Sequence, residues 1–339
     1  MEPPSKPMMT TAPPLLTRIR LLAQLWVFKF VVATYCRFRH RTTNRLPLHQ
    51  KPTFTKTYGP TSVESRVFIP KSYKSGDAPL PLLIDIHGGG FCIGEPMLDD
   101  PDNLILAHLH GFCVVSIPYR LGPQFNFPAA PKDCAAAIAD VLDDDSLPVD
   151  KSRVAVAGYS AGGNLALTAT QFPGIKGRIK GIAAYYPVTN FTATIDAKVA
   201  GQTLPPDGKD ALRWMSPMFN IGYLEAGIDR TDPLLSPIFA QREDLPEKVS
   251  ILGCEYDMLC KEAELMAEDL STAEEGQKTP LQDGKVGWTK GSIRWELIEG
   301  AKHGFNQQPA RGEEAKILRA KTEKMHAGIA EWLKKEVYS

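Results

Sequence analysis

The chain has 339 residues, of which 43% are hydrophobic and 23% charged, as is ordinary for a soluble globular protein. Its 39 basic and 39 acidic side chains cancel, so no overall field would draw it to nucleic acid. A neutral or weakly polar small molecule is the more compatible partner, and the length fits one large domain with or without a lid.

The six cysteines form no metal-binding pattern. None belongs to a CxxC or CxxH pair, so we predict no zinc site, and no cofactor is expected. Cys113, Cys134 and Cys254 lie inside apolar stretches, as small hydrophobic residues do. We interpret the cysteines as reduced thiols, which favours an intracellular and cytoplasmic location.

The N-terminal region, residues 1–59, is predicted to form a tail and a lid helix. Residues 1 to about 14 are rich in Pro, Thr and Met and are expected to be disordered. The apolar segment 21–38 is interrupted by Gln24 and Lys29, and neither apolar half reaches the ~20 residues that span a bilayer. We favour a lid helix over an active site. A membrane-associated helix with basic flanks and a cleaved secretory signal remain as alternatives.

Residues 60–339 alternate apolar strands with helices, which predicts a mostly parallel sheet flanked by helices. An insertion at about 190–230, rich in Pro, Met and aromatic residues, is predicted to complete the lid. The polar, Gly-rich segment 275–292 is predicted to be a surface loop. The expected strands are Val67–Ile69, Pro81–Ile86, Phe112–Ile117, Val154–Ala157, Ile182–Tyr186, Val249–Leu252 and Arg294–Ile298.

A G-x-S-x-G sequence, Gly158 to Gly162, lies between an expected strand and an expected helix. In that context the pentapeptide indicates a sharp turn that exposes the hydroxyl of Ser160 at a helix N-terminus. Small neighbours are needed because the turn is tight. Ser160 is therefore the candidate nucleophile.

A glycine run, His87-Gly88-Gly89-Gly90-Phe91, follows another expected strand. Successive glycines allow bare backbone N–H groups to face one point. Together with the N–H of Ala161, the N–H groups of Gly88 and Gly89 are predicted to form an oxyanion hole.

Asp257 and His303 each follow an expected strand, where the sites of α/β proteins gather. The chain order serine, acid, histidine is that of a hydrolase triad with a G-x-S-x-G nucleophile. We therefore predict that His303 is the base and Asp257 the acid that orients it. Glu255, two residues earlier, remains the rival acid.

The sequence resembles the hormone-sensitive-lipase-like family of α/β-hydrolases, which includes microbial esterases and plant carboxylesterases. The resemblance implies an α/β-hydrolase fold, a catalytic triad, a three-donor oxyanion hole and a lid. Three positions depart from the usual family pattern: Tyr159, the pair Gln124-Phe125, and Met258. The matching blocks are His87–Phe91, Tyr119–Leu121 with Phe127–Ala130, Ser160–Leu165, and Asp257 with His303–Phe305.

These observations predict a serine hydrolase that cleaves carboxylic esters of an apolar, neutral small molecule. A tailoring enzyme of small-molecule biosynthesis, using the same site for acyl transfer, cyclisation or condensation, is the alternative. A ligand-binding protein on this fold is disfavoured because His303 is present. The expected substrate-binding residues are Phe91, Tyr159, Trp214, Met218 and Phe219.

Overall fold

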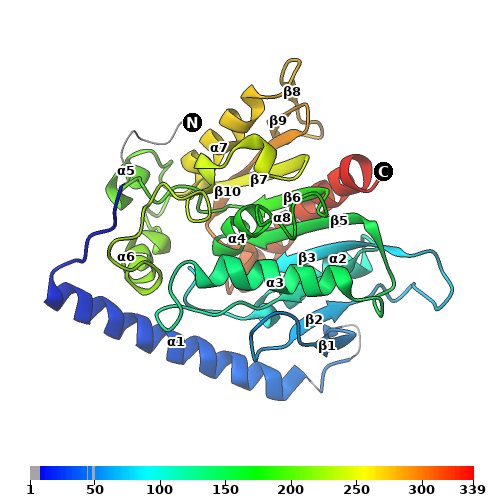
Figure 1. Cartoon of the computed structure of the whole chain (residues 1–339), viewed down its shortest axis with the longest axis horizontal. Helices are drawn as coiled ribbons and strands as arrows, with labels where there is room; N and C mark the ends of the chain where they lie inside the picture. Colours follow the sequence, from blue (N-terminus) through cyan, green and yellow to red (C-terminus); the bar gives the residue numbers. More distant parts are fainter. Residues whose placement is uncertain (1–7, 44, 48–49) are drawn as a thin grey trace.

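The computed structural model describes residues 8–43, 45–47 and 50–339. Within them, ten strands form one sheet in the order β1-β2-β4-β3-β5-β6-β7-β10-β9-β8 (Figure 1). The central strands β4, β3, β5, β6, β7 and β10 run parallel, and both edges are antiparallel. The strands are β1 (Phe54–Lys56), β2 (Ser65–Phe68), β3 (Leu80–Ile86), β4 (Cys113–Ile117), β5 (Val149–Tyr159), β6 (Gly181–Tyr185), β7 (Lys248–Tyr256), β8 (Thr279–Pro280), β9 (Val286–Lys290) and β10 (Ile293–Lys302).

Helices cover both faces of this sheet, because its central strands are apolar on both sides. Leu82 and Ile84 of β3 belong to one hydrophobic cluster, whereas Leu83 belongs to the other, since successive side chains point to opposite faces. The first cluster includes α3 (Ala129–Asp143), α4 (Ala161–Ala169) and α7 (Cys260–Thr272). The second includes α2 (Asp100–His108) and α8 (Gly312–Trp332). The predicted fold class is therefore confirmed.

The segment 275–292 is not the surface loop that its composition predicted. It contains β8 and β9, and β9 pairs antiparallel with β10, where Trp288 lies opposite Trp295. An antiparallel edge strand buries only one face, so its sequence can be polar and still form a strand. This hairpin extends the sheet beyond its last parallel strand.

The N-terminal helix α1 spans Leu15–Thr43 and is longer than the predicted segment 21–38. It runs along the outside of the molecule, from the region of α5 and α6 to the edge at β1 and β2 (Figure 1). The insertion forms α5 (Ile195–Ala200) and α6 (Ala211–Tyr223), and α1 contacts α6. Among the described residues, no helix is long and apolar enough to cross a membrane.

The tail before α1 is partly ordered, so the prediction of disorder is wrong for residues 8–10. The N–H of Thr10 donates to the carbonyl of Ile228 at 2.7 Å, and Met9 forms a β-bridge with Asp229. Because these pairings bind the tail to a distant segment, its local composition could not predict them. Residues 1–7 lie outside the described residues.

Candidate active site

Ser160 lies at the turn between β5 and α4, with φ of 55° and ψ of −114°. Positive φ is strained for a residue with a side chain, so the surrounding contacts must hold it. The N–H of Ser160 donates to the Tyr185 carbonyl at 2.9 Å. A Cβ at Gly162 would overlap the Ile86 carbonyl oxygen, and one at Gly158 would overlap the Gly162 carbonyl oxygen. The small residues of the G-x-S-x-G sequence are therefore required by space.

The structure brings Ser160, His303 and Asp257 together in one hydrogen-bonded row. His303 Nε2 lies 2.8 Å from Ser160 Oγ, and His303 Nδ1 lies 2.6 Å from Asp257 Oδ2. A carboxylate only accepts, so Nδ1 carries the hydrogen and Nε2 is free to accept from the serine hydroxyl. Burial lowers the pKa of His303, but the Asp257 carboxylate outweighs burial and the net pKa is raised.

Asp257 and its rival Glu255 occupy different environments. Asp257 is fully buried, and its second oxygen accepts from the N–H of Leu259 at 2.9 Å. Glu255 accepts instead from the N–H of Gly300 at 2.7 Å. The described contacts therefore join Asp257, and not Glu255, to His303.

The glycine run lies beside the sharp turn that carries Ser160. A Cβ at Gly88 would lie 3.6 Å from the Cβ of Ser160, and one at Gly89, where φ is 119°, would overlap the Ile93 carbonyl oxygen. Ala161 follows Ser160 directly, at the start of α4. Gly88 and Ala161 thus adjoin the nucleophile, and Gly89 is the next residue of the same glycine run.

Two buried side chains support the glycine run from behind. His87 stacks on Tyr119 with ring centroids 4.3 Å apart, and the Tyr119 hydroxyl donates to the His87 carbonyl at 3.0 Å. Burial lowers the pKa of His87 to about 4, so the ring is neutral and can donate from Nδ1 to the Gly88 carbonyl 2.7 Å away. His87 therefore holds the backbone of the glycine run.

A cavity of about 280 Å³ opens onto Ser160 and is walled mainly by apolar side chains. Phe91 and Phe219 line it, as predicted from the sequence. Its other apolar walls are Val188, Phe191, Ala193, Ile195, Leu212, Tyr223, Leu224, Met258 and Leu259.

Three predicted substrate-binding residues lie elsewhere. Tyr159 stacks on Tyr185 at 4.6 Å in the hydrophobic cluster that includes α8, because its side chain leaves β5 on that face. The cavity side of α6 carries Leu212, Phe219 and Tyr223. Because an α-helix turns 100° per residue, Trp214 and Met218 point away from the cavity. Trp214 is exposed to solvent, and Met218 is buried in the core.

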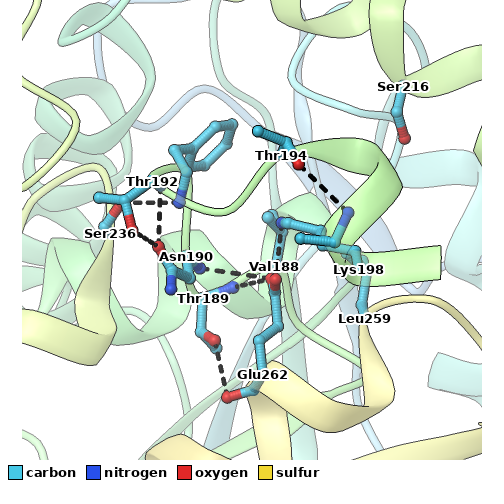
Figure 2. Close-up of polar contacts among 12 residues, drawn as sticks. Val188, Thr189, Asn190, Thr192, Thr194, Lys198, Ser216, Ser236, Leu259 and Glu262 are labelled. Carbon is cyan, nitrogen blue, oxygen red and sulfur yellow. Dashed lines mark hydrogen bonds and ion pairs between the residues drawn. The ribbon is translucent and has the colours of Figure 1, made fainter. Parts of the chain in front are cut away.

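An ion pair in the cavity wall was not predicted from the sequence. Lys198 of α5 lines the cavity, and its Nζ lies 2.6 Å from Glu262 of α7, with both side chains at most 9% exposed. Figure 2 shows the Glu262 carboxylate also reaching the backbone of Thr189 and Asn190, whose N–H groups donate at 2.8 and 3.3 Å. Burial raises the pKa of Glu262 although Lys198 opposes the shift. No motif could have revealed a pair 64 positions apart in the chain.

The six cysteines all lie within the described residues, and each is a free thiol. In the same part of the chain, no group of three or more His, Cys, Asp or Glu side chains is placed to hold a metal ion.

A family model described as "alpha/beta hydrolase fold" matches residues 83–285, more than half of the chain. The protein therefore belongs to this family of α/β-hydrolases, and the predicted resemblance to its hormone-sensitive-lipase-like carboxylesterases is confirmed.

Individual relatives carry ester-hydrolase names. The carboxylic ester hydrolase LipN of Mycobacterium tuberculosis is 34% identical over 213 residues, covering 59% of this chain and 54% of LipN. An arylesterase of Saccharolobus solfataricus is 30% identical over 191 residues, covering 55% and 60% respectively. The chain thus spans little more than half the length of these curated relatives. A solved esterase of Pyrobaculum calidifontis superposes with a TM-score of 0.70 at 26% identity, covering 97% of this chain and 100% of that one.

Proposed function

We propose that the protein is a serine hydrolase that cleaves carboxylic esters. The observation that carries this proposal is the row of hydrogen bonds from Ser160 through His303 to Asp257, at the floor of an apolar cavity. Membership of the α/β-hydrolase family and the names of its relatives support the same chemistry.

In this mechanism the Ser160 hydroxyl attacks the ester carbonyl while His303 Nε2 takes its proton. Asp257 keeps the imidazole in the required tautomer and stabilises the imidazolium that forms. The N–H groups of Gly88, Gly89 and Ala161 stabilise the oxyanion, each contributing ~3 kcal/mol by analogy with known oxyanion holes. The protonated His303 then releases the alcohol, and water hydrolyses the acyl-enzyme.

The walls of the cavity support an apolar and neutral substrate. Aromatic and aliphatic side chains make up most of the wall around the space above Ser160, and its charged members are Asp196, Lys198 and Arg230. The charge of Lys198 is balanced by Glu262 directly behind it. Six free cysteines support an intracellular location for this chemistry.

A fluorophosphonate probe and a panel of p-nitrophenyl esters of increasing acyl length test the proposal together. We expect stoichiometric labelling and ester turnover by the wild-type protein, and neither by Ser160→Ala. Alanine is smaller than serine, so the variant should still form the tight turn between β5 and α4. Near wild-type turnover by Ser160→Ala would refute the nucleophile assignment. Labelling of Ser160 without turnover of any ester would refute ester hydrolysis as the reaction.

A further inference from the structure

The helix α1 has two apolar faces, and only one of them is covered by the described chain. Leu25 and Cys36 are buried on the inner face. The Lys29 ammonium, also on that face, donates to the carbonyls of Cys92 and Gly122 at 2.8 and 2.6 Å. These contacts fix which side of the helix faces outward.

The outward face carries six large apolar side chains that are between 55% and 82% exposed. With 100° per residue, they fall on one continuous stripe opposite Leu25. Isolated exposed apolar residues are common, but a continuous stripe over several turns marks an interaction surface. The residues of this outer stripe are Leu16, Ile19, Val27, Phe30, Val31 and Phe38.

The charge of α1 identifies the partner. The helix has no Asp or Glu but contains Lys29 and five arginines, whereas the whole chain has equal numbers of acidic and basic side chains. Arg20, Arg37 and Arg41 are exposed near the two ends of the outer stripe. An apolar centre with arginines at its ends complements the acyl chains and acidic headgroups of a lipid surface. Two copies of α1 pairing face to face would bring arginine against arginine, which disfavours self-association.

We propose that α1 is a membrane-docking helix that lies flat on an anionic lipid surface through its outer stripe. Its 29 residues extend ~44 Å along the surface. The sequence allowed two interpretations of this N-terminal segment, a lid helix and a membrane-associated helix. On this proposal, each interpretation describes one face of the same helix. The inner face rests on α6, and the outer face enters the lipid interface.

The same arrangement connects the lipid surface to the catalytic cavity. A second cavity, of about 700 Å³, lies between α1 and α6 and is lined by Leu21, Leu22 and Trp26. Asn220, Leu224 and Arg230 border both this cavity and the one at Ser160. The two cavities are therefore neighbours, and, given the proposed esterase function, displacement of these three side chains would open a route for a membrane-dissolved ester from beneath α1 toward the nucleophile.

Vesicle flotation of the full-length protein tests the docking directly. We expect the protein to float with phosphatidylcholine vesicles containing about 30 mol% phosphatidylserine, and ~10-fold weaker partitioning without phosphatidylserine or at high salt. Phe30→Asp should weaken partitioning by ~10-fold or more, since it places a charge in the middle of the outer stripe. The matched control is Ile317→Asp on α8, where the side chain is 57% exposed, and it should float like wild type.

Turnover of a water-soluble p-nitrophenyl ester should be equal in both variants, which shows that they are folded. An ester dissolved in the vesicles should be cleaved more slowly by Phe30→Asp alone. Full-length protein that stays unbound with the anionic vesicles would overturn the proposal. Equal flotation of the two variants would also overturn it. A third contradicting result is a dimer in light scattering that Phe30→Asp dissociates, without any binding to lipid.

If flotation holds but soluble esters are not cleaved, the docking surface stands and the proposed esterase function fails.

Discussion

The two sides of the candidate site are built in different ways. On one side, Ser160, Asp257 and His303 each come directly after a strand, namely β5, β7 and β10. These strands belong to one continuous ladder with β6, so backbone hydrogen bonds set the spacing of the three residues. On the other side, which we call the helical side, α5 and α6 lie outside the sheet. Met218 of α6 packs into the hydrophobic core, and Lys198 of α5 pairs with Glu262. The sheet therefore positions the reacting groups, whereas apolar packing and a buried ion pair hold the helices that wall the pocket.

The largest effect is expected on the sheet side, from Asp257→Asn. The amide would favour the wrong tautomer of His303, so kcat should fall by ~10⁴-fold, as for comparable triads. Steady-state kinetics on a soluble ester measures this change. Glu255→Gln is the matched control and should keep kcat near wild type, because Glu255 contacts Gly300 and not His303. If Glu255→Gln lowers kcat and Asp257→Asn does not, the acid of the triad is Glu255 and the assignment of Asp257 is wrong.

On the helical side, Glu262→Gln should act on stability and binding more than on chemistry. It leaves the buried Lys198 ammonium without its carboxylate, which costs ~3–5 kcal/mol for buried pairs. We expect a lower free energy of unfolding in urea and a KM that rises more than kcat falls.

The control is Asp244→Asn, which breaks the ion pair with Lys176, where the two side chains are 41% and 47% exposed. Such surface pairs contribute ~0–1 kcal/mol, so this variant should stay close to wild type. Equal unfolding free energies for the two variants would show that the buried pair does not stabilise the helical side.

The smallest expected effect is a shift in the pH profile. His303 acts as a base only when neutral, and Asp257 raises the pKa of His303 above its ordinary value. The rate kcat/KM should therefore be lost as pH falls through that raised pKa, with a midpoint above the ordinary pKa of a histidine. The residual activity of Asp257→Asn should show a lower midpoint. An unchanged midpoint would mean that the profile reports a different group.

The sequence predicted the sheet side well because its signals are local. The local patterns are glycines around Ser160, and an acid and a histidine that each come just after an apolar strand. In a parallel sheet, such patterns predict an active site at the carboxyl ends of the strands. The helical side depends on which way a helix faces, and that is set by tertiary contacts. Trp214 and Met218 were therefore misplaced although their helix was located in the correct segment. Tyr159 was misplaced because successive side chains of a strand point to opposite faces of the sheet, and that of Tyr159 points away from the cavity.

The hairpin of β8 and β9 carries a practical consequence for protein engineering. A designer reading only composition would shorten residues 275–292 as a dispensable loop. That deletion would strip the partner from Ile293–Leu297 of β10 and leave this edge of the strand with open backbone groups, a template for aggregation. Peptide tags or reporter insertions belong instead at Gln282–Gly284, the exposed turn between the two strands, where new residues leave the strand pairing intact.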